Sequence, residues 1–465
     1  MINAIFRRMP RLGAQRDMLS ILLAVNVSWV GLVASADVPA NASMANIART
    51  LTAMENSTVR DPAHLRVMLW GQSIVAQGWD RFIREEFRRR YPTVVFDEWS
   101  NRAIGGWEAQ NLYRTSESDL YPFYPDLLFF HVYGDMDRYE EIVRETRRRT
   151  TADIVLWTSH LRTDESPEKM LAERNERSRR ILEIADKYGC AVVDLNRKWS
   201  EWILRDKVVP TNILRDVIHM RDSTLPIYAK FLYEEIVPVP GAKPDESKVG
   251  TVTEIPWEDP RVKKLPDGSV ELAFDGNRVV AVSGSRASGC ANILLDGSPV
   301  NSYRESWYAT RPGRGPIWMP LIKTAGFEAV PVEELWTLTF LPGSAADGSI
   351  VHFRVEGSVT GPDGEGWSTN DFRSVSGRVT LKAADWCNDR YQRFKDGRRF
   401  AVGDSIRWRT LPIVDDPFRP HGEGTRTTLV QGCSNGPHVL RLQSDDRDGS
   451  LGKLRFIVHK PADMK

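Results

Sequence analysis

This 465-residue chain has few cysteines, almost no excess of one charge and few long hydrophobic runs, and each of these features argues against a class of protein. The 4 cysteines form no Cys-x-x-Cys pair and no histidine–cysteine cluster at zinc spacing, so we expect no structural metal. The 63 lysines and arginines balance 62 aspartates and glutamates, whereas a dedicated nucleic-acid-binding protein usually has a basic excess, so we expect no nucleic-acid partner. Beyond the N-terminal region, no segment is apolar enough to span a bilayer.

The four cysteines are Cys190, Cys290, Cys387 and Cys433. An oxidising compartment permits disulfides, and four cysteines allow three full pairings that the sequence does not distinguish. Cys387 with Cys433 is the favoured pair, because both lie in the same β-rich region. Cys190 lies in an apolar strand, so we expect a buried thiol there.

The first 36 residues have the pattern of an export signal. Four arginines precede a charge-free stretch over 18–36 with an apolar centre, and Ala34-Ser35-Ala36 matches the small-x-small cleavage site. We predict that residues 1–36 are a signal peptide and that the protein is exported, extracellular or periplasmic, with no stable membrane span after cleavage. A signal anchor is the alternative, because the apolar stretch is nearly long enough to cross a bilayer.

Residues 61–237 alternate between strand and helix periodicity. Strands are predicted at 65–70, 94–96, 127–130, 154–157 and 191–193, and helices at 74–90, 137–149, 167–188 and 225–236. Short apolar strands separated by helices are typical of a parallel sheet covered on both faces, an α/β fold. Sites in such sheets form beyond the carboxyl ends of the strands. Ser73, Gly106, Gly134 and His160 all follow a predicted strand there.

Residues 238–249 are rich in proline and are predicted to form a linker. In residues 250–465 the pattern predicts strands without long helices. We predict a β-sandwich-like C-terminal region, as one large sandwich or two small ones, with hairpin turns at Asp296-Gly297 and Asn435-Gly436. Its aromatic residues are usually core residues in such a fold, and sugar stacking is the alternative: Tyr303, Trp307, Tyr308, Trp318, Trp367, Trp386, Tyr391 and Trp408.

Two short motifs supply a serine, an aspartate and a histidine. Ser73 follows the first apolar strand, and Asp216 stands three residues before His219. A histidine oriented by a carboxylate makes a serine hydroxyl nucleophilic at neutral pH, and the spacing lets Asp216 accept the Nδ1–H of His219 while Nε2 faces the serine. Each motif alone is weak, because serine is a favoured helix N-cap and a surface acid near a histidine is common. The arginine runs 88–90 and 147–149 are interpreted as solvated helix ends.

Residues 64–237 resemble the SGNH (GDSL-type) hydrolase superfamily. Gly71-Gln72-Ser73 is similar to the Gly-Asp-Ser motif of the family. The segment from Asn101 to Gly106 is similar to the second conserved block of the family, and the segment from Asp216 to His219 is similar to its last block. The resemblance implies a flavodoxin-like three-layer parallel sheet. It also implies Ser73 as nucleophile, His219 as general base, Asp216 as its orienter, and the backbone N–H groups of Ser73 and Gly106 as oxyanion donors. No metal or organic cofactor is required.

The third block departs from the family pattern. The family has Gly-x-Asn-Asp, whereas this chain has Gly134-Asp135-Met136-Asp137, and a thioether donates no hydrogen bond. Asn101, His131 and Tyr133 are the nearby groups that can replace the missing donor. For substrate contact the candidates are Asn101, His131 and His160, and a solvated loop histidine is the simpler interpretation of His160.

Together these features predict an exported serine esterase that deacetylates a glycan through an acyl-enzyme, acting on an acylated small molecule or polysaccharide. Export and the appended β-rich region favour the glycan by association. One alternative is a lipid or thioester hydrolase of the same superfamily. The other is an inactive glycan-binding or surface-assembly protein, favoured by Gln72 and Met136 and opposed by the presence of all three triad residues.

Overall fold

The computed structural model describes residues 41–285, 289–313, 320–387, 401–444 and 451–464. The predicted signal peptide, together with Trp318 and Tyr391, lies outside the described residues. Within those ranges, no helix combines the length and the apolar character needed to cross a membrane.

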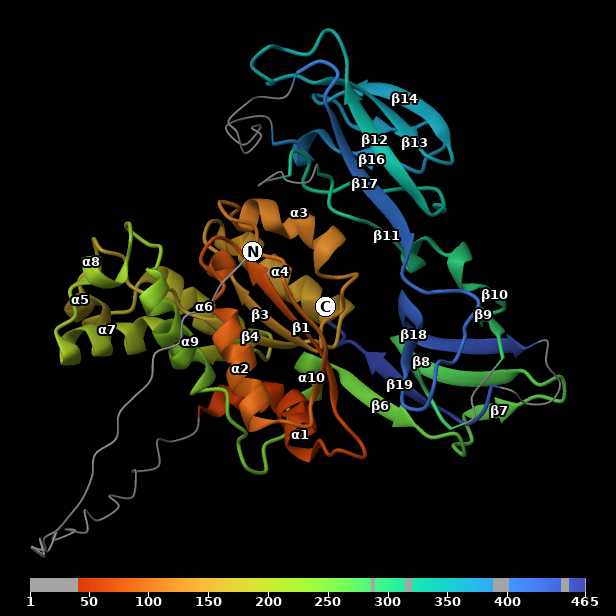
Figure 1. Cartoon of the computed structure of the whole chain (residues 1–465), viewed down its shortest axis with the longest axis horizontal. Helices are drawn as coiled ribbons and strands as arrows, with labels where there is room; N and C mark the ends of the chain where they lie inside the picture. The colour runs from red at the N-terminus through yellow and green to blue at the C-terminus, as the bar shows by residue number, and fades with distance from the viewer. Residues whose placement is uncertain (1–40, 286–288, 314–319, 388–400, 445–450, 465) are drawn as a thin grey trace, which may run out of the picture. The chain divides into compact units, whose positions relative to one another are not determined.

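A parallel five-stranded sheet organises residues 41–237, which we call the α/β part (Figure 1). Its spatial order is β2-β1-β3-β4-β5, and every neighbouring pair is parallel. This is the flavodoxin-like order, so the predicted fold class is confirmed. The strands are β1 (His64–Gly71), β2 (Val95–Asn101), β3 (Leu127–His131), β4 (Asp153–Trp157) and β5 (Ala191–Val193).

Side chains of the sheet alternate between two hydrophobic cores, because successive residues of a strand point to opposite faces. In β1, Val67 and Leu69 belong to one core and Met68 and Trp70 to the other. Among the helices that contribute to the first core are α1 (Ala48–Asn56), α2 (Asp80–Arg90), α7 (Leu195–Asp206) and α9 (Leu225–Tyr233). Those of the second core are α3 (Ala109–Asp119), α4 (Met136–Arg149) and α6 (Glu176–Lys187).

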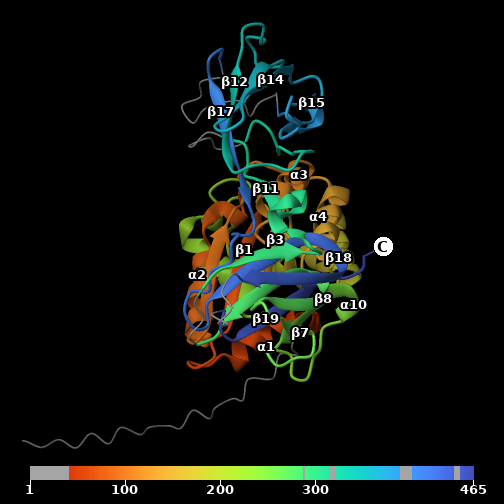
Figure 2. The same ribbon diagram turned by 90° about the vertical axis from the view of Figure 1, so that its right-hand side faces the viewer.

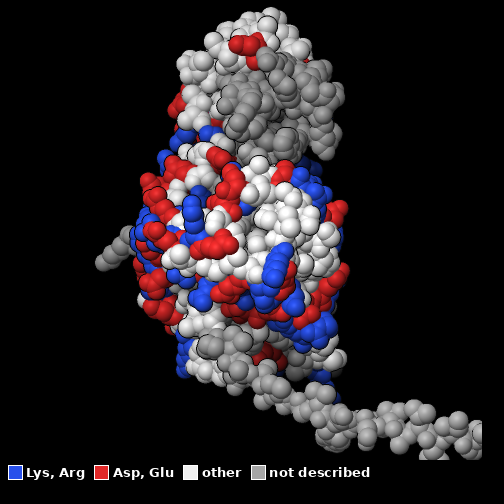
Figure 3. All heavy atoms as spheres, turned by 90° about the vertical axis from the view of Figure 1, so that its left-hand side faces the viewer, with Lys and Arg blue, Asp and Glu red and all other residues white. Residues whose placement is uncertain are grey.

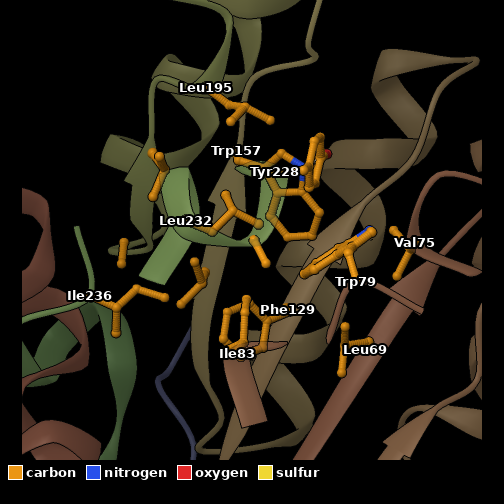
Figure 4. Packing of buried hydrophobic residues seen from close by; sticks show 14 of the residues in the cluster. Leu69, Val75, Trp79, Ile83, Phe129, Trp157, Leu195, Tyr228, Leu232 and Ile236 are labelled. Carbon is orange, nitrogen blue, oxygen red and sulfur yellow. The ribbon is translucent and has the colours of Figure 1, made fainter. Parts of the chain in front are cut away.

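Large aromatic rings fill the first core near the carboxyl ends of β1 and β4 (Figure 4). Trp79 packs edge-on against Trp157 at 5.5 Å between ring centroids and lies 5.3 Å from the ring of Tyr228. The indole N–H of Trp157 donates to the Tyr228 hydroxyl at 2.8 Å, and that of Trp79 donates to the carbonyl of Ile74 at 2.7 Å. The second bond anchors the turn that follows Ser73.

Two helices differ from the prediction. The helix expected from residue 74 begins only at Asp80, after a 3₁₀ turn, η2 (Val75–Gln77), because Gly78 adopts a left-handed φ of 78°. Ser73 therefore lies in a turn and is not a helix N-cap. The helix expected over 167–188 is divided into α5 (Pro167–Ala172) and α6, where the Asn175 side chain caps α6 by accepting the N–H of Ser178.

The interpretation of residues 147–149 as a solvated helix end is wrong for Arg147. Its side chain is fully buried and donates to the carbonyls of Tyr188 at 2.9 Å and Gly189 at 2.6 Å, and also to that of Ala152. These three carbonyls belong to the two loops that lead into β4 and β5, so the guanidinium ties those loops together. Hydrogen bonds to all its nitrogens make the burial of this cation tolerable.

The cysteines do not form the favoured disulfide. Cys433 has a free thiol, which donates to the carbonyl of Gly276 at 3.8 Å, so the Cys387–Cys433 pairing is wrong. Cys190 is a buried free thiol, as predicted, and lies immediately before β5.

The rest of the chain is rich in antiparallel strands, which confirms the predicted β-rich region (Figure 2). One sheet has the order β10-β9-β18-β8-β19-β6, with β7 also paired to β8, and another has the order β11-β17-β12-β13-β14. Each sheet has its own hydrophobic core. The strands of the first are β6 (Thr251–Ile255), β7 (Val262–Lys264), β8 (Val270–Ser283), β9 (Ala291–Leu295), β10 (Ser298–Pro299), β18 (Arg426–Ser444) and β19 (Leu454–Lys460). Those of the second are β11 (Trp307–Ala309), β12 (Glu334–Phe340), β13 (His352–Gly357), β14 (Gly361–Trp367) and β17 (Ser405–Pro412).

The two predicted hairpin turns have different outcomes. Asp296 and Gly297 have φ values of 49° and 84° and join β9 to β10, as expected for a two-residue hairpin loop. Asn435-Gly436 instead lies inside the long strand β18, where the register against β8 shifts between Gln431 and Gly436, so that prediction is wrong. Within the predicted linker 238–249 the structure has a short helix, α10 (Glu246–Val249), and the domain boundaries stay a prediction.

Candidate functional site

The serine of the first motif lies two residues beyond the end of β1, at the carboxyl edge of the sheet. Gly71, the last residue of β1, pairs with His131 of β3. A Cβ atom at Gly71 would lie 2.1 Å from the His131 carbonyl oxygen, so only glycine allows this approach of the two strands. The glycine before the serine is therefore required by the backbone packing of the strand end that positions Ser73.

The structure brings Ser73, His219 and Asp216 into one hydrogen-bonded chain. Nε2 of His219 lies 2.9 Å from Oγ of Ser73, and Nδ1 of His219 lies 2.9 and 3.1 Å from the two carboxylate oxygens of Asp216. An ionised carboxylate only accepts, so Nδ1 carries the proton and Nε2 accepts from the serine hydroxyl. This is the arrangement in which imidazole can take the serine proton.

Asp216 is held ionised by the loop that carries it. Its Oδ1 accepts the backbone N–H groups of Ile218 at 2.9 Å and His219 at 2.7 Å. Burial by itself would raise the pKa of Asp216, but these two N–H groups and the His219 side chain outweigh it and lower the pKa to about 2. The side chains of Asp216 and His219 are 49% and 25% exposed, so solvent reaches the pair.

The loop between α8 (Pro210–Ile213) and η3 (Asp222–Thr224) is closed on itself and fastened to the neighbouring elements. Leu214 and Met220 form a β-bridge across it. Gln77 of η2 donates to the Met220 carbonyl at 3.0 Å and accepts the Met220 N–H at 3.4 Å. Gln77 thus connects the turn after Ser73 to the residue after His219. Gln77 is not among the residues predicted from the sequence, because a polar residue in a predicted helix carries no signal of this contact.

His160 and His131 lie in the core and not at the rim of the sheet edge. Their side chains are 1% and 0% exposed. His160 donates from Nε2 to the Ile218 carbonyl at 2.7 Å, and His131 shares a 3.0 Å hydrogen bond between Nε2 and the Ser159 hydroxyl. Burial lowers the pKa of His160 to about 4 and that of His131 well below its usual value. The expectation of direct substrate contact at either histidine is therefore corrected. The interpretation of His160 as a solvated loop histidine is also wrong, because this buried side chain supports the loop of His219 from inside.

The side chain of Asn101 is also engaged in hydrogen bonds within the protein. It is the last residue of β2, and its amide group donates to the Val75 carbonyl at 2.9 Å and to Asp80 at 3.0 Å, while its oxygen accepts the Ala103 N–H at 3.2 Å. With both amide hydrogens engaged, Asn101 has none left for an oxyanion. Its bonds instead fix the turn from η2 to α2.

The backbone groups expected to bind an oxyanion remain available. Neither the Ser73 N–H nor the Gly106 N–H donates a hydrogen bond to another group within the described ranges. Met136 begins α4, whose N-terminus is capped by Asp135 through the N–H groups of Asp137 and Arg138. The hydroxyl of Tyr133 is buried and has no hydrogen-bond partner among the described residues.

Charge is finely mixed on the face of the molecule drawn in Figure 3, where acidic and basic side chains are interspersed. The near-neutral net charge is therefore not produced on this face by two separate patches of opposite sign.

Across the described residues, no group of three or more histidine, cysteine, aspartate or glutamate side chains is arranged to hold a metal ion.

Comparisons with known proteins found no matching family model and no matching curated protein sequence. Among solved structures, the chain is similar to a two-domain esterase active on acetylated mannans, with 13% identity and a TM-score of 0.37, over 89% of this chain and 95% of that one. It is also similar to an acetyl xylan esterase, with 19% identity and a TM-score of 0.31, over 37% of this chain and 100% of that one. An acetylxylan esterase from Geobacillus stearothermophilus shares 17% identity over 38% of this chain and 95% of that one, with a TM-score of 0.33. At these values the likeness is one of general architecture.

Proposed function

We propose that this protein is a serine ester hydrolase that removes acetyl groups from a glycan. The observation that carries the proposal is the hydrogen-bonded chain from Ser73 through His219 to Asp216 at the carboxyl edge of the sheet. Three groups separated by up to 146 residues in the chain meet with the donor and acceptor order that nucleophilic catalysis needs.

The chemistry follows from that order. Oγ of Ser73 attacks the ester carbonyl while Nε2 of His219 takes its proton and then gives it to the departing alcohol oxygen. Water resolves the acyl-enzyme in a second attack, with His219 again as base. Asp216 holds the imidazole in the required tautomer and stabilises the imidazolium that forms in each step.

The oxyanion of each tetrahedral intermediate needs hydrogen-bond donors. The free N–H groups of Ser73 and Gly106 supply two in this proposal. Methionine replaces the asparagine that supplies a third in the resembling family, and the loss of one such donor lowers kcat by about 10²–10³. We therefore propose a slower esterase than one with three donors.

The glycan is the part of the proposal that rests on the β-rich region. Trp367, at the end of β14, is 39% exposed and stacks face to face on His352 with 4.3 Å between ring centroids. The exposed part of its indole offers an aromatic surface on which a sugar ring can stack. Tyr303, Trp307 and Tyr308 line a cavity of about 1050 Å³. Trp386 and Trp408 are buried core residues and take no part.

The test is hydrolysis of p-nitrophenyl acetate by the full chain and by Ser73→Ala, with Ser247→Ala, an exposed serine of α10, as the matched control. We expect a loss of about 10⁴–10⁶ in kcat for Ser73→Ala and none for Ser247→Ala. Equal, slow rates for all three proteins would contradict the proposal and favour an inactive glycan-binding protein.

The substrate class is tested by acetate release from acetylated xylan and mannan, beside a series of p-nitrophenyl esters of increasing acyl length. A deacetylase releases acetate and loses kcat/KM as the acyl chain grows. A kcat/KM that rises with chain length would instead support a lipid or thioester hydrolase.

A further inference from the structure

A buried arginine that forms no salt bridge with any described residue lies on strand β8. Arg278 is 5% exposed, and its Nε has no hydrogen-bond partner among the described residues. Its hydrogen bond runs from Nη2 to the Thr428 hydroxyl at 3.3 Å, and its guanidinium lies over the ring of Tyr124 at 4.7 Å. Burial of a charge is strongly unfavourable unless the charge is paired. Asp126 attracts this guanidinium without forming a salt bridge to it, so an anion bound directly to Arg278 would stabilise the charge further.

Arg278 faces the α/β part of the molecule. It stands opposite Gln431 of β18 and His459 of β19 in the sheet, so the three side chains share a face. Gln431 donates to the Pro122 carbonyl at 2.8 Å, and His459 shares a 2.8 Å hydrogen bond with the Thr151 hydroxyl. These contacts show that the face carrying Arg278 packs against loops of the α/β part.

A cavity of about 970 Å³ opens at this packing surface, and Arg278 lines it together with Arg66 and Arg426. The Nε of Arg426 also has no partner within the described ranges, while Arg66 has a carboxylate oxygen of Glu98 at 3.6 Å. Five arginines and four carboxylates line the cavity in all, and the carboxylates are Asp97, Glu98, Asp126 and Glu254. Asp126 attracts the guanidinium of Arg278 but forms no salt bridge with it, and it accepts the Arg66 backbone N–H at 2.7 Å. Positive charges therefore outnumber negative ones by one, and within the described ranges Arg278 and Arg426 are the arginines of this cavity whose buried Nε lacks a partner.

Burial and, after it, nearby positive charges shift the pKa values of two residues that line the cavity. Burial, followed by the charge of Arg66, lowers the pKa of Arg278 to about 10. Burial and the charges of Arg278, Arg49 and Arg426 lower the pKa of His459 well below its usual value, so this histidine is neutral. A bound anion would relieve both effects.

We propose that this cavity binds a small organic anion of saccharide size, with a carboxylate or phosphate group held by Arg278 and Arg426. Guanidinium groups bind these oxyanions through paired, charge-assisted hydrogen bonds. The cavity is far larger than an inorganic ion and is also lined by Phe123, Tyr308 and Ile457, which favours a ligand with a carbon skeleton.

This site is separate from the triad. Arg66 lies near the start of β1 and Ser73 beyond its end, so at about 3.3 Å per residue the two residues are about 20 Å apart. Neither Ser73 nor His219 lines the cavity. The inference therefore goes beyond the proposed esterase activity and does not depend on it.

The test is calorimetric titration of the full chain with D-glucuronate, glucose 6-phosphate, inorganic phosphate and neutral D-glucose. We expect binding of one or both sugar anions, none of glucose, and at least about a tenfold rise in Kd for Arg278→Met, the effect of losing a charge-assisted hydrogen bond. Arg179→Met, an exposed arginine of α6, and Ser73→Ala should bind as the wild type does. Glucuronate against glucose 6-phosphate distinguishes the carboxylate from the phosphate. Phosphate bound as tightly as the sugar anions, or equal binding by Arg278→Met, would overturn the proposal.

Thermal unfolding separates a binding role of Arg278 from a structural one. We expect the bound anion to raise the Tm of the wild type and not that of Arg278→Met. Without the anion, Arg278→Met should have a Tm no lower than the wild type, because an unpaired buried charge is removed. A lower Tm with no anion effect on the wild type would assign Arg278 to packing alone and refute the site. If Arg278→Met does not fold, Arg426→Gln, at a more exposed position, must weaken binding in the same titration.

Discussion

Replacement of Asp216 by asparagine tests the most specific electrostatic feature of the site. Asparagine keeps the size of the side chain, and its Oδ1 can still accept the N–H groups of Ile218 and His219. Its amide nitrogen donates and cannot accept, so it no longer holds the proton on Nδ1 of His219. The imidazole then favours the tautomer with its proton on Nε2, which cannot accept the Ser73 hydroxyl.

The magnitude follows from the distance and the exposure of the pair. Unit charges at the observed 2.9 Å attract by about 6 kcal/mol at an effective dielectric constant of 20 and by about 1.4 kcal/mol in bulk water. Asp216 is 49% exposed, so solvent screening places the imidazolium stabilisation between these limits, at about 3 kcal/mol. With the wrong tautomer added, we expect Asp216→Asn to lose about 10²–10³ in kcat, less than the about 10⁴ seen for a buried triad aspartate.

The assay is kcat for p-nitrophenyl acetate from pH 5 to 9. Asp222→Asn is the matched control, because it removes the same charge from an exposed aspartate of the following turn. The pKa of Asp216 is lowered to about 2, so its carboxylate is ionised throughout this range and the loss should be present at every pH. A loss below about threefold, or an equal loss in Asp222→Asn, would refute the role given to Asp216.

Three further predictions concern the support of the site. The pKa of His160 is about 4 in the folded protein against 6.5 in the unfolded chain, so the unfolded chain binds the extra proton as pH falls from 6.5 to 4, and the free energy of unfolding decreases by about 3 kcal/mol. Urea unfolding at pH 7 and 4.5 should show a smaller decrease for His160→Gln than for the wild type, and an equal decrease would contradict this. Gln77→Leu should lower kcat by about tenfold with little change in KM, because the clamp on Met220 is lost, and steady-state kinetics with full KM curves will show whether KM moves instead. Gly71→Ala should destabilise the fold by more than about 3 kcal/mol, since its Cβ would meet the His131 carbonyl at 2.1 Å, and a Tm within about 2 °C of the wild type would disprove that contact.

The sequence by itself determined the elements whose signal is local. The five strands of the α/β part were predicted because each is a short apolar run between helices, and burial on both faces leaves such runs without polar interruptions. The order of the serine, aspartate and histidine motifs along the chain was also readable. The Asp296-Gly297 turn could be predicted because its two residues favour the left-handed backbone that the turn requires.

Only the tertiary structure decided features that depend on contacts between distant residues. Whether Asn435-Gly436 is a turn or a bulge depends on continued pairing of β18 with β8, which lies some 160 residues earlier in the chain. Whether His160 reaches substrate or supports the His219 loop depends on the position of the Ile218 carbonyl. The hydrogen bond between Ser73 and His219 and the burial of Arg278 without a salt bridge also depend on such contacts. Hydrogen bonding and desolvation are set by the groups that pack around a side chain and not by its neighbours in sequence.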